Sequence, residues 1–561
     1  MKTKTSGFSM TMSPGMENYF HLSGGERMEE IKNGLSRRSF IVGTAATGAL
    51  AALGLSGCGN DAEEVPADAE EVPAEGEGEG AATGELSAAV AYETTNFLPF
   101  NNSSALAVGA NWHVVEGLYE LDMTTYEPFP ALAAGDPVQV SDTEYEITLR
   151  EGAAYSDGIP VTAEDVVASY KRTVEAEGAL YLSMLTFIKD IVAKDETTVT
   201  VLLNMPFSLL KNRLALIKVC PAAATDEDLT AKPLGSGPWA YSEITEKNIT
   251  FVPNEFYTGT KPATAAAMRF DIIKDDTART QAMTEQTVQV MENVPADMQG
   301  QLEGAGVTVE AVQGFGLAFL MFNTKKAPFD DNRVRQACFY AIDMQKLIDN
   351  ALSGLATPLK CFLPETYAHF HEAATVFTYD PEKAKALLAE AGAEGTSLTL
   401  QTTDHPWIKA LSPQIKNDLE AIGLTVAINE QASAALYANQ TDVDDPQFDV
   451  ALAPGDPSCF GNDPDLLMNW WYGDNIWTQK RTQWNTSDEF AQLRELMAEA
   501  VEASGDEQQE LWNQCYDLIA DQVPLYPLFH KSLLTGYLAD ALDGYKPIGT
   551  TGISFVGVNA K

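Results

Sequence analysis

Hydrophobic and polar residues follow regular periods from Leu86 onward. Over residues 145–150 apolar and polar side chains alternate, and this period of two predicts a strand with one buried face. Thr162 and Asp165 then form the pattern of a capping box, and the apolar residues that follow have helical spacing. The chain therefore passes from a strand period to a helix period.

The same succession of strands and helices continues in the C-terminal half. Asp380 is a suitable N-cap with Pro381 at the first helical position, and this helix should end at Gly392. Alternating strands and helices indicate an α/β fold with mixed or parallel sheets. Further strands are expected at 197–203, 398–401, 424–428 and 448–453, and a further helix at 411–422.

The segment from Leu35 to Cys58 has the pattern of an export signal. Arg37 and Arg38 precede an apolar run of small residues, and paired arginines at this place are the address of the twin-arginine route. The run over 41–55 is shorter than the ~20 apolar residues that span a bilayer. Leu-Ser-Gly-Cys at its end resembles the lipobox of bacterial lipoproteins, in which Cys58 would become the acylated first residue. The alternative is a weak membrane helix with a chance cysteine.

Residues 58–84 follow the predicted signal peptide (1–57) as a disordered acidic tether. Glu-Glu-Val-Pro-Ala occurs twice and Glu-Gly repeats follow, so too few apolar residues recur to form a core. The whole chain has a formal net charge of −44. This balance excludes nucleic acid as a partner, because phosphates demand a basic surface, and it disfavours direct contact with anionic lipid. We expect most of the charges to form a solvated face.

Neither the cysteines nor any sequence motif points to catalysis. Six cysteines occur, at 58, 220, 338, 361, 459 and 515, and their spacing matches no zinc or redox motif. With Cys58 acylated we expect buried free thiols, and a single disulfide is the alternative. No Gly-x-Ser-x-Gly, His-Glu-x-x-His or phosphate-binding loop occurs. The sequence therefore predicts no enzyme activity and no cofactor.

Several sequence blocks occur in the order typical of one protein family. They lie at 115–119, 145–152, 155–166, 233–239, 253–257, 322–324, 329–343 and 379–384. The chain resembles, from about residue 86 to its end, the extracellular solute-binding proteins (family 5) of ABC importers, which include oligopeptide, dipeptide and nickel receptors. Many of these residues suit turns and caps: Gly158 can take a positive φ, and an aspartate within 329–331 can cap the next helix. We expect the blocks to define architecture rather than ligand contacts.

The resemblance implies a two-lobed α/β fold of the periplasmic-binding-protein type (class II) with a hinge and an extra small domain. Lobe I would comprise 85–123, 232–325 and 529–561, the small domain 124–231, and lobe II 326–528. Ligand would be enclosed between lobes that close by hinge bending. The protein would be a monomer with ABC permease and ATPase subunits as partners, held by lipid on the outer face of the cytoplasmic membrane.

The strongest candidate site is the loop at 454–465, because it follows the expected strand at 448–453 and such loops commonly bind ligands. It resembles the segment of the peptide receptors in which an aspartate after a glycine pairs with the α-ammonium group of the peptide. Gly455 and Asp456 match that pair, and a carboxylate in a closed cleft makes a strong charge-assisted hydrogen bond. The alternative makes Asp456 a turn or capping residue. Asp463 is expected to cap the following helix.

The other end of a peptide needs a cation or backbone amides. Dipeptide receptors place an arginine after the equivalent of strand 398–401, and oligopeptide relatives can use a nearby histidine. His405 and Trp407 occupy this region here, and no arginine occurs between Arg335 and Arg481. This departure argues against carboxylate clamping of the dipeptide-receptor kind.

Two further candidate segments come from the predicted lobe I. Asn96 and Phe97 resemble a strand end that pairs with peptide backbone, and Phe315 and Gly316 resemble the return strand at the hinge. Main-chain hydrogen bonds of this kind give broad specificity. Trp407, Trp470, Trp471 and Trp477 could line apolar pockets, although each is individually more typical of a core.

These observations favour a lipid-anchored receptor that captures peptides and delivers them to an ABC permease. The alternatives are the same fold with a nickel chelate, haem or a saccharide as ligand, and a surface lipoprotein with no part in transport. His369 and His371 suggest a metal or haem, but the six histidines are spread too widely for a ligand cluster, so we expect an exposed loop and no metal site.

Overall fold

The computed structural model describes residues 84–176 and 179–561. The predicted signal peptide with Arg37 and Arg38, the acylation site Cys58 and almost all of the tether lie outside this part. Within the described residues, no helix is both long and apolar enough to cross a membrane.

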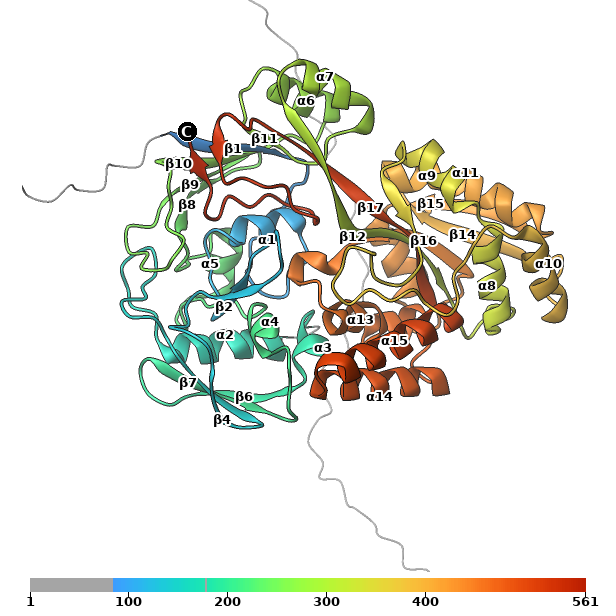
Figure 1. Ribbon diagram of the computed structural model, residues 1–561, viewed down its shortest axis with the longest axis horizontal. Coiled ribbons are helices and arrows are strands. Elements are labelled where there is room, and N and C mark those ends of the chain that lie inside the picture. Colours follow the sequence, from blue (N-terminus) through green and yellow to red (C-terminus); the bar gives the residue numbers. More distant parts are fainter. Residues whose placement is uncertain (1–83, 177–178) are drawn as a thin grey trace, which may run out of the picture. The chain divides into compact units, whose positions relative to one another are not determined.

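One large mixed sheet forms the frame of the protein, in the order β15-β14-β16-β12-β17-β11-β1-β10-β9-β8, with β13 also paired to β17 (Figure 1). Its two longest strands, β12 (Thr308–Phe322) and β17 (Leu525–Tyr537), are antiparallel partners. They connect the strands of lobe I (β1 and β8–β11) to those of lobe II (β13–β16). The other strands are β1 (Glu85–Val90), β8 (Trp239–Ile244), β9 (Asn248–Pro253), β10 (Ala267–Ile272), β11 (Val290–Met291), β13 (Ala356–Pro358), β14 (Ser397–Thr403), β15 (Thr425–Gln431) and β16 (Val450–Gly455).

Lobe I has its own core. β1 pairs in parallel with β10 and β11, while β8, β9 and β10 form antiparallel pairs. Trp239, Phe251 and Phe270 are each no more than 1% exposed and lie in one apolar cluster. The chain end returns to this lobe through β18 (Leu542–Asp543) and β19 (Asn559–Ala560). Its helices are α1 (Ala105–Asn111), α5 (Asp226–Ala231), α6 (Asp276–Thr284) and α7 (Gln299–Gly304).

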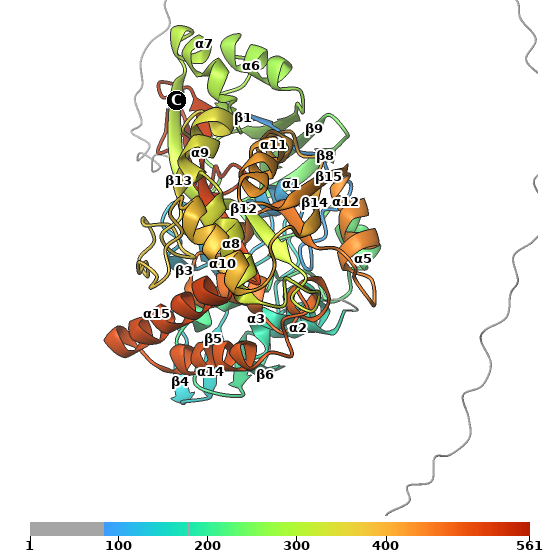
Figure 2. The same cartoon turned by 90° about the vertical axis from the view of Figure 1, so that its right-hand side faces the viewer.

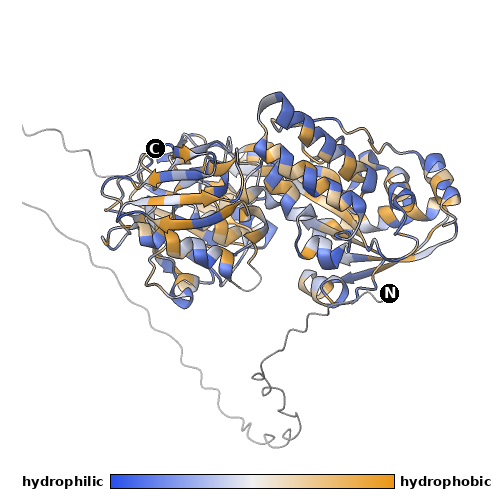
Figure 3. Ribbon diagram, turned by 90° about the horizontal axis from the view of Figure 1, so that it is seen from below, coloured by the Kyte–Doolittle hydropathy of each residue, from blue (hydrophilic) through white to orange (hydrophobic). Residues whose placement is uncertain are grey.

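Lobe II is built on three parallel strands, because β14 pairs in parallel with both β15 and β16. The strands expected at 398–401, 424–428 and 448–453 are confirmed as β14, β15 and β16. The helices are α8 (Asn332–Ala341), α9 (Met344–Leu352), α10 (Pro381–Glu390), α11 (Pro406–Ala421), α12 (Ser433–Leu436), α13 (Pro464–Tyr472), α14 (Asp488–Glu502) and α15 (Gly505–Gln522). Figure 2 shows several of these helices, among them α8–α11 and α15, from the side. The helices carry both hydrophobic and hydrophilic residues (Figure 3), as expected for helices that cover a core.

A second sheet of four antiparallel strands, in the order β4-β5-β7-β6, carries α2 (Ala163–Glu175). Its apolar residues belong to the same buried cluster as those of lobe II. The lobe and small-domain boundaries expected from the sequence stay a prediction. The remaining elements are β2 (Tyr119–Leu121), β3 (Pro128–Pro130), β4 (Val138–Ser141), β5 (Glu144–Thr148), β6 (Ile188–Ala193), β7 (Thr198–Leu203), α3 (Leu182–Leu185) and α4 (Leu210–Leu214).

The expected helix caps are confirmed. Asp380 caps α10 by accepting a hydrogen bond from the Lys383 backbone, Asp331 caps α8, and Asp463 caps α13. Asp165 accepts the Thr162 backbone N–H at 2.9 Å, which completes the predicted capping box of α2. The helix expected at 411–422 was placed too late in the chain. It begins at Pro406, because proline fixes the first helical position there, although Pro413 interrupts the helix interior.

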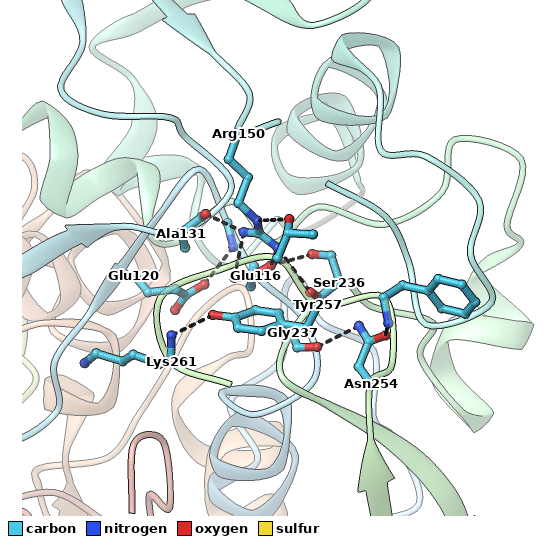
Figure 4. A network of polar contacts seen from close by, with 12 residues as sticks. Glu116, Glu120, Ala131, Arg150, Ser236, Gly237, Asn254, Tyr257 and Lys261 are labelled. Carbon is cyan, nitrogen blue, oxygen red and sulfur yellow. Dashed lines mark hydrogen bonds and ion pairs between the residues drawn. The ribbon is translucent and has the colours of Figure 1, made fainter. Parts of the chain in front are cut away.

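Four of the family-like sequence blocks meet in one polar network around the ion pair of Arg150 and Glu116 (Figure 4). The guanidinium donates to both carboxylate oxygens of Glu116 at 3.0 and 2.8 Å, and the Ser236 hydroxyl donates to the same carboxylate at 2.9 Å. The Tyr257 ring lies 5.1 Å from the Arg150 guanidinium carbon. Blocks far apart in the chain are thus held together by buried charge, which is an architectural role.

Candidate functional site

Asp456 directly follows β16, and its two carboxylate oxygens make different contacts. Its Oδ1 accepts hydrogen bonds from the backbone N–H and hydroxyl of Ser458, at 3.0 and 2.5 Å, so it caps the short 3-10 helix Pro457–Phe460. Its Oδ2 accepts the Thr550 hydroxyl at 3.2 Å, from a buried part of lobe I. The capping role of Asp456 is thus confirmed, and its role toward a ligand stays a prediction.

The neighbours of Asp456 include both glycines singled out in the sequence. A Cβ on Gly316 would lie 3.5 Å from Asp456 Oδ2, so the β12 strand passes close to the carboxylate. A Cβ on Gly455 would lie 2.3 Å from the Trp471 ring, so only glycine allows this close approach of strand and indole. Burial raises the pKa of the Asp456 carboxyl, while hydrogen bonds from Ser458 and Thr550 oppose that rise.

His405 and Trp407 lie at the same edge of the sheet as Asp456. They begin α11 immediately after β14, and β14 and β16 are parallel neighbours, so their carboxyl ends meet. His405 is the N-cap residue of α11, with its Nδ1 3.0 Å from the Thr403 hydroxyl. Burial lowers the pKa of His405, and the charge of Asp404 opposes this. Both side chains are half-buried.

Lys531 lies beside Trp407 and is not among the residues singled out from the sequence. It lies on β17, and its Nζ is 5.2 Å from the centre of the Trp407 ring. Burial lowers the pKa of Lys531, and the nearby carboxylates of Asp276 and Asp456 oppose that shift. The sequence does contain a signal for Lys531. Within the run 525–537 it is the one Lys, Arg, Asp or Glu residue.

Tyr92 lies near the Asp456 loop and is 42% exposed. The pKa of its hydroxyl is raised, first by loss of solvent and then by the negative charge of Glu292, and Asp456 adds to this rise. Glu292 itself accepts hydrogen bonds from the backbone N–H of Ala91 and Gly552, at 3.0 and 2.8 Å. Thr550 and Tyr92 thus bring lobe I close to the loop that carries Asp456.

The side chains of three other candidates make contacts within the protein, and the main-chain contacts expected of them with a peptide stay a prediction. The Phe97 side chain is 2% exposed and packs edge-on against Tyr241, with ring centres 5.9 Å apart. Phe315 is fully buried and packs against Phe362. Asn96 is exposed, and its side-chain oxygen accepts the Leu98 backbone N–H at 2.9 Å, which forms a local turn. We therefore do not retain the side chains of Phe97 and Phe315 as ligand contacts.

The aromatic candidates other than Trp407 form a packed cluster. Trp471 is 2% exposed, and the Trp477 ring centre lies 4.5 Å away from its own. Trp470 stacks on Phe460 at 5.6 Å. Phe460 also lines an apolar pocket beside the Asp456 loop, together with residues of lobe I and the small sheet, among them Leu98, Val108, Trp112, Met123 and Tyr181.

No group of three or more metal-ligating side chains occurs among the residues that the structure describes. His369 Nδ1 lies 2.9 Å from the Gln509 side-chain oxygen, and His371 Nε2 lies 3.6 Å from Asp517. The cysteines of this part are all unpaired: Cys459 is half-buried, and Cys220, Cys338, Cys361 and Cys515 are buried. The expectation of buried free thiols is thus confirmed for these four.

The fold and the cleft together define a class of protein: two lobes joined by β12 and β17, with polar side chains of both lobes gathered around one loop. Such an arrangement encloses a small ligand between lobes.

Residues 127–479 match the family of bacterial extracellular solute-binding proteins, family 5, in the middle region of its members. The chain belongs to this family. Heme-binding protein A of Haemophilus influenzae is 27% identical over 477 residues, which cover 77% of this chain and 84% of that protein. The dipeptide-binding protein of Escherichia coli is 28% identical over 347 residues, 55% of this chain and 65% of the other.

A solved structure supports the fold. The ABC transporter-associated periplasmic binding protein DppA of Helicobacter pylori, in complex with peptide STSA, superposes with a TM-score of 0.73 at 23% identity, over 85% of this chain and 98% of the other. The predicted family and two-lobed fold are confirmed. Family members are binding proteins of ABC importers, so this chain is a binding protein and not an enzyme.

Proposed function

We propose that this protein captures peptides in the cleft between its lobes and delivers them to an ABC permease. One observation carries the proposal: the Asp456 carboxylate lies at the carboxyl end of β16, and its Oδ2 faces lobe I at Thr550. A ligand ammonium placed there makes a charge-assisted hydrogen bond in a partly desolvated cleft. The dipeptide-binding and peptide-bound relatives support the choice of peptide.

The test begins with ligand identification. Mature protein is incubated with a peptide mixture, and the peptides that copurify are identified by mass spectrometry. Each is then titrated in a thermal-shift assay, where a true ligand raises the unfolding temperature as its free concentration rises. The proposal fails if no peptide with a free N-terminus is retained and another solute is.

The residue test is Asp456→Asn, which keeps the shape and the capping oxygen and removes the charge. Truncating one partner of a buried charge pair costs about 2–5 kcal/mol, so we expect roughly a 30- to 5000-fold weaker Kd for peptides. The matched control is Asp380→Asn, which makes the same change at the cap of α10. Unchanged peptide affinity in Asp456→Asn contradicts the assigned role.

The same variant separates the alternatives. The Haemophilus relative is named for heme, and a heme, nickel-chelate or neutral saccharide ligand has no α-ammonium group for Asp456 to hold. If Asp456→Asn and the original protein bind one of these solutes with equal affinity, that solute and not a peptide is the ligand of the cleft. Normal peptide uptake in a deletion strain would instead favour a surface lipoprotein with no part in transport.

The proposal includes a lipid anchor at Cys58 and export by the twin-arginine route. A receptor that stays near its permease gains from tethering, and the acidic stretch after Cys58 would separate the lobes from the membrane. Cys58→Ala should release the protein from the membrane fraction, as metabolic labelling with a fatty acid can verify. Replacement of Arg37 and Arg38 by lysine should trap precursor inside, and unchanged export would point to the general secretory route.

A further inference from the structure

Lys531 stands out among the cations of this acidic protein. The chain has 36 Lys and Arg residues against 80 Asp and Glu, so a basic side chain easily finds a carboxylate. Within the described residues, Lys531 Nζ makes no ion pair and no hydrogen bond, yet the side chain is half-buried and burial lowers its pKa. Burial of an ammonium without a partner is unfavourable, so an anion that reaches Lys531 gains a charge-assisted hydrogen bond.

The backbone explains where the side chain points. On β17, His530 is 3% exposed, and its ring nitrogens lie 3.1 Å from the Phe315 carbonyl and 3.0 Å from the Phe362 carbonyl. Successive side chains of a strand point to opposite faces, so Lys531 points away from that packed side. On its own side it meets the Trp407 ring at 5.2 Å.

The charges around Lys531 come from both lobes. Asp276 lies in the first turn of α6 in lobe I and already pairs with Arg279 at 2.5 Å. Asp456 is already engaged by Ser458 and Thr550. Both carboxylates are near enough to act on Lys531, and neither forms a salt bridge with it. Lys531 thus keeps its hydrogen-bond donors free, beside the carboxylate proposed to hold a ligand ammonium.

We propose that Lys531, seated on Trp407, is the anion subsite of the cleft and receives a carboxylate of the same ligand whose ammonium pairs with Asp456. The inference rests on the proposed function and adds a ligand class: zwitterionic peptides with a free carboxylate, at the C-terminus or on a side chain. Trp407 holds the ammonium in place by a cation–π contact while leaving its N–H groups available.

The test uses oligoalanines of two to five residues, each as the free acid and as the C-terminal amide. Their Kd values are measured by isothermal titration calorimetry with the original protein, Lys531→Met and Lys531→Arg. We expect the original protein to prefer the best-binding acid over its amide by at least tenfold. Lys531→Met should reduce this preference to less than threefold, and Lys531→Arg should retain most of it.

The matched control is Lys409→Met, a lysine of α11 that pairs with Glu430 at 2.7 Å and is 45% exposed. It should leave the preference unchanged. If Lys531→Met does not fold, Trp407→Leu replaces it and should lower the preference at least threefold. Equal binding of acids and amides by the original protein overturns the anion subsite while peptide binding stands. Binding of no peptide in either form overturns the proposed function itself, and the subsite with it.

Discussion

Arg213 offers the sharpest test of how the Asp456 loop is held in place. Its guanidinium is fully buried in α4 and donates to both carboxylate oxygens of Asp463, at 2.5 and 2.7 Å, and to Asp465 at 2.7 Å. Asp463 also caps α13 through the Leu466 backbone N–H. One cation of the small-sheet region therefore fixes the end of the loop that begins at Asp456.

Arg213→Met keeps most of the side-chain volume and leaves two buried carboxylates without their cation. Removal of one partner of a buried pair destabilises by about 3–5 kcal/mol. With an unfolding entropy of about 2.1 cal/mol/K per residue over ~480 residues, this corresponds to a fall in Tm of roughly 3–5 °C. Thermal unfolding of ligand-free protein at pH 7, followed by circular dichroism, measures it.

The control lies on the same helix. Lys211 pairs with Asp136 at 2.9 Å, but the two side chains are 39% and 77% exposed. Exposed pairs contribute about 0.2–1 kcal/mol, so Lys211→Met should lower Tm by about 1 °C or less. A triple variant of Arg213→Met with Asp463→Asn and Asp465→Asn should recover part of the loss, because no unpaired charge remains. Equal Tm shifts for Arg213→Met and Lys211→Met would refute this reasoning.

The loss of stability caused by Arg213→Met should depend on pH, in a direction that the buried carboxylates determine. Burial raises the pKa of Asp465, and Arg213 opposes that rise in the original protein. Without Arg213 the folded-state pKa rises further above the unfolded value. A carboxyl of this kind favours the folded state at low pH and loses that contribution as pH rises through its folded pKa. The variant should therefore differ less from the original protein at pH 4.5 than at pH 7.

Two further predictions concern buried groups. Burial lowers the pKa of His113 to about 4, and its Nε2 accepts the Phe555 backbone N–H at 2.8 Å, so the ring is neutral in the folded protein. Its folded pKa lies below the unfolded one, so up to about 3 kcal/mol of stability should disappear as pH falls from 6.5 to 4. Histidine-selective NMR should show a ring that does not titrate above pH 5, and titration near 6.5 would contradict this. Burial raises the pKa of Cys220, Cys338 and Cys361 to about 12, so native protein at pH 8 should leave these thiols unreacted with Ellman's reagent until guanidinium is added. Rapid labelling of the native protein would contradict their burial.

Local signals in the sequence identify several of the helices and strands. Asp380 before Pro381 marks a helix start through a hydrogen bond within one turn, and such a signal needs no tertiary information. At α11 only the proline is shared: Pro406 holds the first helical position, whereas His405 makes no side-chain capping hydrogen bond. The apolar spacing over 411–422 does not include this first turn, so it predicts a start that is too late.

The site depends on contacts that no local pattern records. Phe97 follows a polar residue and Phe315 stands between two glycines, yet each is buried against rings of distant segments. Thr550 reaches Asp456 across 94 positions of sequence. Lys531 meets Trp407 only because β17 returns beside β12 and the sheet carries α11 to the same face. Pairing of distant strands decides these neighbours, so the sequence identifies the loop and not its surroundings.

The contact between Asp456 and Thr550 has a consequence for selectivity. It joins the two lobes through a neutral hydroxyl at 3.2 Å. An ammonium that takes the place of this hydroxyl forms a charge-assisted bond about twice as strong, whereas a neutral ligand group gains little from the exchange. A ligand shifts the balance between open and closed lobes only through contacts that differ between the two states. Under the proposed function, closure is therefore favoured by cationic groups at Asp456, and the lobes themselves select against neutral solutes.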